Sequence, residues 1–219
     1  MMAAMKGAVR RRWALTVVLI GALIGPAVAT AQTVRFGVHG VGISHAEINE
    51  NRRVDGTGVG GQITVRVGRF GLELSGYTAQ MTDAPEGVEE FDLLQGDVRV
   101  SFRIARSLAI EVGGGRRKVD PEFAAQDIGW GRLGILSEVQ LSRIGSLWGR
   151  GAYLLNAEFN GGGDAGLAVE LGLGAGLGTA NGRFRVRVEY EFQRLDREIG
   201  TVKVPIQMTV AKFGVDLGF

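Results

Sequence analysis

After residue 32 the chain alternates between apolar and polar positions in ten segments of eleven to nineteen residues. Alternation with a period of two is typical of β-strands that present one apolar face. The segments cover residues 33–46, 57–67, 70–81, 91–104, 107–119, 128–142, 146–159, 166–179, 183–195 and 201–219. The pattern therefore predicts an all-β protein, with ten strands as the main interpretation and eight strands as the alternative.

The connections between these segments alternate in length. Tight turns are expected at 68–69, 105–106, 142–145 and 180–182, and longer polar connections at 47–56, 82–90, 120–127, 160–165 and 196–200. Each segment exceeds the about 9 to 11 residues that a tilted strand needs to cross a bilayer. Because an open sheet edge in lipid leaves backbone groups without partners, such strands must close on themselves. We predict a closed antiparallel up-and-down transmembrane β-barrel with short turns at one end and loops at the other.

The eighth and ninth segments show the two faces of the sheet. Between Arg183 and Gln193, aromatic and Val residues alternate with charged residues, and between Leu167 and Gly178, Leu and Val residues alternate mainly with Gly. The Asn181-Gly182 dipeptide between them is a strong signal for a tight hairpin turn. The register set by that turn pairs Arg185, Arg187, Glu189 and Glu191 with Gly178, Gly176, Gly174 and Gly172. This pairing explains part of the glycine content, 36 of 219 residues, as room for large inward side chains.

The same alternation predicts a network of charged residues inside the barrel. Its members are Arg66, Glu73, Arg99, Arg103, Glu111, Arg132, Glu138, Glu170, Arg185, Arg187, Glu189 and Glu191, with Asp97 beside them. Buried charges must be paired or hydrated. They form either a salt-bridged plug or the lining of a narrow, arginine-biased pore, and a ten-stranded barrel lies nearer to the filled barrels than to the open ones.

The first 31 residues have the parts of a secretory signal peptide. Lys6 and the run Arg10–Arg12 precede an apolar stretch of twelve residues, Trp13–Ile24, which is followed by small residues. We expect cleavage after Ala31, which leaves residues 32–219 as one barrel domain. The signal carries four of the 25 Lys and Arg and none of the 23 Asp and Glu, so the remaining chain has a net charge of −2. The basic charge of the full chain is therefore no indication of nucleic-acid binding.

The last strand ends in a pattern with a specific resemblance. Phe213, Val215, Leu217 and Phe219 alternate to a terminal aromatic residue, and the chain contains no cysteine. With the signal peptide and the period-two segments, the chain resembles small bacterial outer-membrane β-barrel proteins over its whole mature length. The resemblance implies location in the outer membrane, contact with its lipid and lipopolysaccharide, and recognition of the last strand by the barrel-assembly machinery. It implies no cofactor and no nucleic-acid partner.

Other residues offer weaker candidates for chemistry. Glu86, Glu89, Glu90 and Asp92 form either a divalent-cation site or, as we favour, a solvated acidic rim. Ser44 and His45 are a candidate nucleophile and base, but adjacent strand residues point to opposite faces. No active-site motif of the known outer-membrane enzymes is recognisable, so we expect no catalysis.

Aromatic residues are expected on the outer surface, in two girdles at the membrane interfaces. We place Phe36, Phe102, Phe184 and Phe219 in the girdle near the chain termini, and Phe159, Tyr190 and Phe192 in the opposite one. Trp130 and Trp148 are expected to be girdle or packing residues.

The sequence favours a structural or surface-interaction role in the cell envelope. A small porin-like diffusion channel is the alternative, and a lipid-modifying enzyme is the third possibility.

Overall fold

The computed structural model describes residues 33–47, 52–83, 90–120, 127–160, 162–179 and 182–219. The expected signal peptide, residues 1–31, lies outside the described residues, as do Glu86 and Glu89. The described chain forms ten strands: β1 (Thr33–Glu47), β2 (Arg52–Val67), β3 (Phe70–Asp83), β4 (Phe91–Ala105), β5 (Leu108–Asp120), β6 (Ile128–Gln140), β7 (Gly145–Phe159), β8 (Asp164–Gly178), β9 (Phe184–Ile199) and β10 (Val202–Gly218). The predicted ten strands are confirmed.

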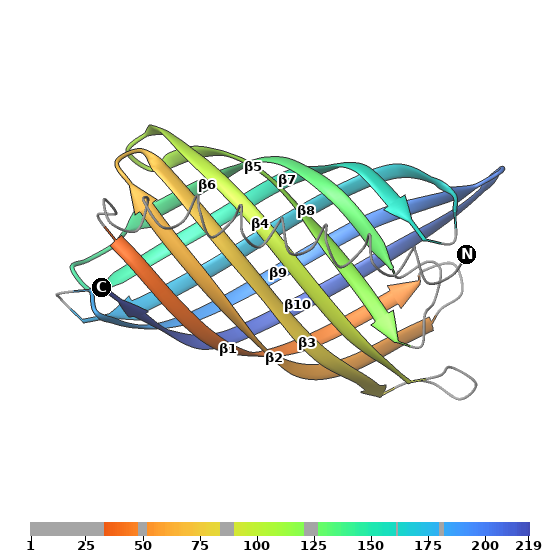
Figure 1. Ribbon diagram of the computed structural model, residues 1–219, viewed down its shortest axis with the longest axis horizontal. Coiled ribbons are helices and arrows are strands. Elements are labelled where there is room, and N and C mark those ends of the chain that lie inside the picture. The colour runs from red at the N-terminus through yellow and green to blue at the C-terminus, as the bar shows by residue number, and fades with distance from the viewer. Residues whose placement is uncertain (1–32, 48–51, 84–89, 121–126, 161, 180–181) are drawn as a thin grey trace, which may run out of the picture.

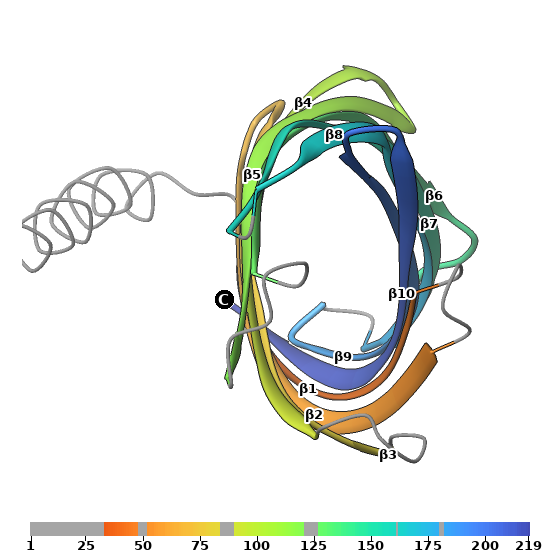
Figure 2. The same ribbon diagram turned by 90° about the vertical axis from the view of Figure 1, so that its right-hand side faces the viewer.

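These strands form one closed antiparallel barrel in which each strand pairs with its neighbours in sequence (Figure 1). The barrel closes where β1 pairs with β10, from Arg35 opposite Gly218 to Glu47 opposite Ile206. Phe219 extends this closure through two backbone hydrogen bonds with Val34, of 3.2 and 2.9 Å. The view along the barrel shows a continuous ring with an oval cross-section (Figure 2). Closure gives the strand edges the backbone partners that a lipid environment does not provide.

The two ends of the barrel carry different sets of connections, and two of the predicted connections are corrected. The start of β1 and the end of β10 share one end with the short connections 68–69, 106–107, 141–144 and 179–183; we call it the terminal end. The opposite end, the loop end, carries the connections 48–51, 84–90, 121–127, 160–163 and 200–201. The expected long connection at 196–200 was wrong, because β9 continues to Ile199 and Gly200, at φ 60°, allows a tight turn into β10. The connection expected at 47–56 is likewise shortened by the start of β2 at Arg52.

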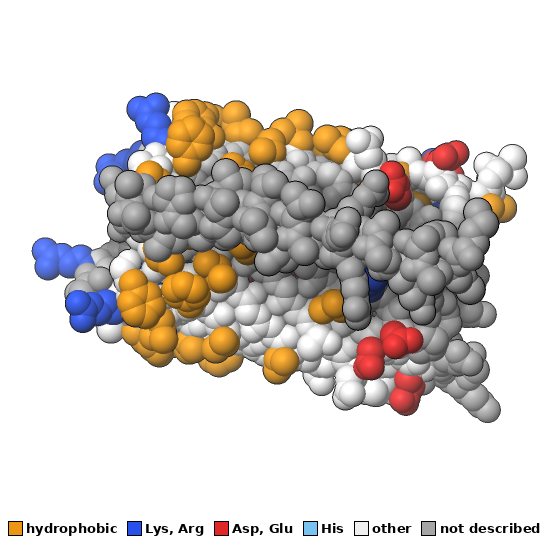
Figure 3. Space-filling view, in the orientation of Figure 1, with side chains coloured by type: hydrophobic (Ala, Val, Ile, Leu, Met, Phe, Trp, Pro, Cys, Tyr) orange, Lys and Arg blue, Asp and Glu red, His pale blue; other side chains and the backbone are white. Residues whose placement is uncertain are grey.

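The outer surface of the barrel is apolar over its terminal half and polar near its loop end. Exposed apolar side chains cover the terminal half, including Phe36, Val98, Val100, Phe102, Ile110, Ile135, Leu173, Val188 and Phe213. Toward the loop end the outward positions carry polar residues, such as Thr78, Gln80 and Thr82 on β3 and Arg116, Lys118 and Asp120 on β5. On the face shown in Figure 3, hydrophobic side chains gather over the terminal half and acidic side chains over the loop end. The strands thus extend beyond the apolar band at the loop end.

Within the described ranges, no helix is both long enough and apolar enough to cross a membrane.

Candidate functional site

The interior of the barrel is the candidate site, and its central part is a layer of paired charges. Arg99 on β4 is the centre of this layer, with its guanidinium nitrogens 2.7 Å from Glu73, 3.4 Å from Glu170 and 3.3 Å from Glu191. These contacts join β4 to β3, β8 and β9, so they cross the lumen as well as the sheet. We call Arg99, its three partners and the residues paired with them the middle charge layer.

Further ion pairs extend the middle charge layer around the barrel wall. Arg132 on β6 pairs with Asp97 at 3.0 Å and also with Glu170. Lys212 on β10 pairs with Glu191 at 2.6 Å, and Arg150 on β7 pairs with Glu73 at 3.3 Å. Nearly all of these side chains are buried. A buried charge without a partner would destabilise the fold by roughly several kcal/mol. Cations and carboxylates therefore hold one another in place across the lumen.

A second, apolar layer lies inside the barrel between the middle charge layer and the loop end. Two clusters of buried side chains form it, one on β1–β5 and β10 and the other on β6–β10. The first cluster consists of Val41, Ile43, Val54, Tyr77, Ala79, Met81, Phe91, Leu93, Val119, Met208 and Val210. The second consists of Ile128, Trp130, Leu154, Ala157, Phe159, Ala168, Leu195 and Ile206. We call them together the apolar layer.

Arg117 joins the two layers and was missed by the sequence analysis. Its side chain is fully buried, at 0% exposure. Arg117 Nε donates to Gln95 at 3.1 Å, its Nη2 donates to Gln193 on β9, and the guanidinium lies 5.6 Å from the centre of the Trp130 ring. The alternation that placed Glu111 inside also places Gly113, Gly115 and Arg117 inside. Arg117 could therefore be predicted by following the alternation past the two glycines.

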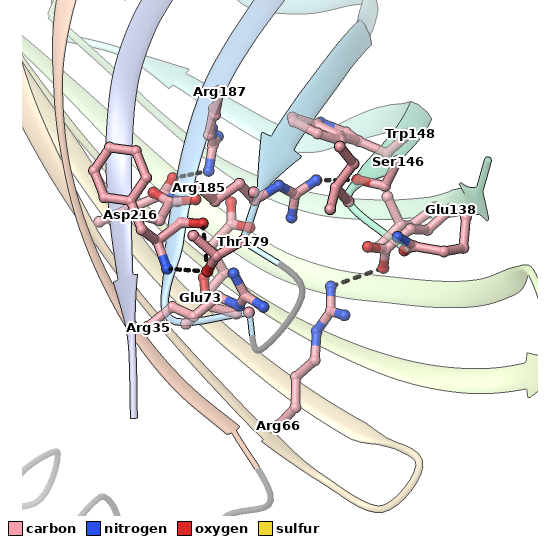
Figure 4. A pocket seen from close by; sticks show the side chains of 18 of the residues that line it. Arg35, Arg66, Glu73, Glu138, Ser146, Trp148, Thr179, Arg185, Arg187 and Asp216 are labelled. Carbon is pink, nitrogen blue, oxygen red and sulfur yellow. Dashed lines mark hydrogen bonds and ion pairs between the residues drawn. The ribbon is translucent and has the colours of Figure 1, made fainter. Parts of the chain in front are cut away.

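At the terminal end the lumen opens into a cavity of about 190 Å³, which we call the vestibule (Figure 4). Six arginines and three carboxylates line it: Arg35, Arg66, Arg143, Arg150, Arg185, Arg187, Glu73, Glu138 and Asp216. Arg66 pairs with Glu138 at 2.8 Å, and Gln62 donates to Asp216 at 3.0 Å. Arg187 pairs with Glu189 deeper in the lumen. The vestibule is therefore the cationic part of the interior.

The structure places most of the predicted charged residues on the inner face of the barrel. Glu73, Arg99, Arg132, Glu170, Glu189 and Glu191 lie in or beside the middle charge layer, and Arg66, Glu138, Arg185 and Arg187 line the vestibule. Glu111 is buried on the inner face of β5. Arg103 differs from the other members because its side chain is exposed at the rim of the terminal end. Arg150, Lys212 and Asp216 also lie on the inner faces of β7 and β10, although the alternation had not marked them as members of the network.

The register predicted between β8 and β9 is confirmed, with Gly178, Gly176, Gly174 and Gly172 opposite Arg185, Arg187, Glu189 and Glu191. The space beside these glycines was predicted to hold the directly paired residues of β9, and at Gly174 and Gly176 this was wrong. A side chain at Gly174 would collide with the Trp148 ring, and one at Gly176 would collide with the Arg185 guanidinium. Trp148 comes from β7, opposite Gly174, so the glycines make room for the other neighbouring strand as well.

A β-bulge corrects the predicted place of one aromatic residue. The register of β6 and β7 shifts between Gly129 and Gly131, and Asn156 has a positive φ of 49°. The extra residue reverses the direction of the side chains that follow, so Phe159 is buried inside the barrel rather than in the outer girdle. Trp130 and Trp148 are packing residues of the interior, not girdle residues.

The other aromatic residues named for the girdles remain on the outer surface. Phe36, Phe184 and Phe219 are exposed at the terminal end. The rings of Phe36 and Phe219 pack edge to face, with their centroids 6.0 Å apart. The ring of Phe102 packs against that of Phe70, with their centroids 4.9 Å apart. Tyr190 is exposed and Phe192 is half-buried.

The described members of the catalytic and metal-binding candidates do not form a site, and Glu86 and Glu89 lie outside the described residues. His45 is buried inside the barrel, whereas Ser44 is on the opposite face, as the sequence predicted. Glu90 and Asp92 are exposed at the loop end. Among the residues that the structure describes, no group of three or more His, Asp or Glu side chains is placed to hold a metal ion.

The outward face of β10 carries the predicted C-terminal pattern. Phe213, Leu217 and Phe219 are exposed and Val215 is half-exposed on this face.

Comparisons with known proteins identify the fold. No family model matches the chain, and no curated protein matches it by sequence. Among solved structures, it is similar to the outer membrane protease OmpT from Escherichia coli, with 11% identity, a TM-score of 0.54, and coverage of 87% of this chain and 98% of that one. Neisserial surface protein A is also similar, with 12% identity, a TM-score of 0.43, and coverage of 85% and 97%. The chain has the closed ten-stranded barrel fold found among small outer-membrane β-barrel proteins.

Proposed function

We propose that this protein is an outer-membrane β-barrel with a closed lumen and a structural or surface-interaction role in the cell envelope. Its terminal end faces the periplasm and its loop end faces outward, which is the arrangement of barrels with short periplasmic turns. The apolar band on the outer surface supports contact with outer-membrane lipid. Lipopolysaccharide then lies against the outward part of the barrel wall.

The packing of buried side chains inside the barrel supports this role over a diffusion channel. The apolar layer comprises buried side chains from all ten strands, and Arg117 connects opposite walls through Gln95 and Gln193. A conducting pore needs a continuous water-filled path lined by polar groups. Within the described ranges, Arg99, Arg132 and Lys212 of the middle charge layer are paired with carboxylates, whereas the cations of a pore lining are free to meet passing anions.

Cell fractionation tests the proposed location. We expect the native protein in the outer membrane, shortened to a chain that begins near Gln32. Before boiling, it should migrate on gels as a compact species, and after boiling as an unfolded one. A soluble periplasmic species that accounts for most of the protein would contradict the proposal.

Liposome swelling tests the proposed closed lumen. Liposomes that contain the folded protein should swell in small sugars no faster than empty liposomes, whereas liposomes with a general porin should swell. Swelling at a rate proportional to the amount of folded protein would favour the channel instead.

A further inference from the structure

The vestibule contains more arginine than its carboxylates can pair. Arg66 and Arg150 pair with Glu138 and Glu73, and Arg187 pairs with Glu189. Within the described part of the chain, Arg35, Arg143 and Arg185 have no carboxylate at ion-pair distance. Asp216 lines the same cavity, and its Oδ1 accepts a hydrogen bond from Gln62 at 3.0 Å. The vestibule therefore holds three arginines that have no carboxylate partner among the described residues.

Arg185 is held in a fixed position rather than extended into solvent. Its Nη2 donates to the Ser146 hydroxyl, and its guanidinium lies 4.8 Å from the centre of the Trp148 ring. Gly176 leaves the space that this guanidinium occupies. A guanidinium stacked on an aromatic ring still presents donors at its edge, so Arg185 is preorganised to bind an oxyanion.

Arg35 faces the same cavity from β1. Its Nη1 is buried and has no hydrogen-bond partner among the described residues. In Figure 4, Arg35, Arg66 and Arg185 surround the cavity together with Ser146 and Thr179. A buried guanidinium nitrogen without an acceptor is unfavourable, and an anion in the cavity would supply that acceptor.

We propose that the vestibule is a binding site for a small multivalent oxyanion that enters from the terminal end. The ligand carries two or more phosphoryl or carboxylate groups, because arginine donates to both in a two-pronged geometry. A volume of about 190 Å³ suits a compact anion rather than a polymer. Since the apolar layer closes the lumen beyond it, the anion binds without passing through the barrel.

Calorimetric titration of the refolded chain 32–219 with inorganic pyrophosphate tests this site. The protein is kept in a maltoside detergent, because phosphocholine detergents would supply competing phosphate. We expect saturable binding with one anion per barrel, and binding that weakens as salt is raised. Citrate as a second probe distinguishes a site that takes phosphoryl groups alone from one that also takes carboxylates. The absence of saturable binding of either probe would overturn the proposal.

Paired variants separate the site from a general effect of charge. Arg35→Gln with Arg185→Gln should weaken pyrophosphate binding by about tenfold or more, because charge-assisted hydrogen bonds are lost. Arg69→Gln with Arg106→Gln removes the same charge from turns at the same end, outside the vestibule, and should weaken binding by less than about twofold. Equal losses in the two pairs would overturn the proposal in favour of diffuse attraction.

Gel migration before boiling checks that each variant is folded. If the Gln pair does not fold, Arg35→Lys with Arg185→Lys keeps the charge and removes the two-pronged donor. This pair should still weaken binding severalfold, and unchanged affinity would contradict the proposal.

Discussion

At the scale of single residues, Arg99 is the most demanding position in the barrel. Its side chain is 2% exposed and has carboxylate partners on three other strands. A buried ion network gives little net stability over an apolar core, but losing one member leaves the others as uncompensated charges. Arg99 is thus needed to balance the negative charge of the three carboxylates that surround it.

Replacing Arg99 with Ala should reduce the free energy of unfolding by about 3 to 5 kcal/mol, because Glu73, Glu170 and Glu191 would lose their shared cation. Urea unfolding in detergent, followed by tryptophan fluorescence, measures this loss. Arg103→Ala is the matched control: it lies on the same strand but is exposed at the rim. Similar losses in both variants would show that the middle charge layer does not stabilise the barrel.

A second residue-scale prediction concerns the inner glycines of β8. Replacing Gly174 and Gly176 together with Leu should cost about 1 to 3 kcal/mol, because the new side chains collide with Trp148 and Arg185. Leu173→Val, on the exposed outer face of the same strand, should cost less. Urea unfolding compares the two, and an equally stable double variant would show that β8 does not need glycine for packing.

At the scale of strands, the features that depend on local sequence pattern, namely the direction of side chains and the register of a hairpin, could be predicted. Strict alternation in β4 and β9 gave the correct inner and outer faces, and Asn181-Gly182 gave the register of β8 and β9. The pattern failed at Phe159, because a bulge is produced by the pairing of β6 with β7 and has no clear signature in β7 alone. It also failed at 196–200, where Asp196 and Glu198 suggested a polar loop but continue β9.

The last strand permits a prediction that separates assembly from stability. Phe219→Ala keeps the backbone hydrogen bonds to Val34, so refolding in detergent should be nearly unchanged. In cells, the variant should give less folded barrel in the outer membrane, because the terminal aromatic residue is the proposed assembly signal. Phe184→Ala, an exposed aromatic at the same end but on β9 and outside the C-terminal pattern, is the control. Equal amounts of folded barrel for wild type and Phe219→Ala would contradict that role.

At the scale of the whole molecule, strand number, closure and the separation of faces could be predicted from the sequence. The choice between a plug and a pore could not, because it depends on contacts across the lumen between strands far apart in sequence. The ion pair of Arg99 with Glu191 and the hydrogen bond of Arg117 to Gln193 are such contacts. The apolar layer was also missed, since Val41, Ile43 and Met208 on inner faces resemble outer-face residues when each strand is considered alone.

Ion conductance tests the closed lumen most directly. The refolded chain 32–219 is inserted into a planar lipid bilayer in concentrated KCl, and its insertion is verified by recovery of the folded species. A general porin under the same conditions supplies the positive control. We expect no stepwise current from this protein, because the apolar layer and the middle charge layer leave no continuous water path. Reproducible unitary steps that scale with the amount of folded protein would contradict the account.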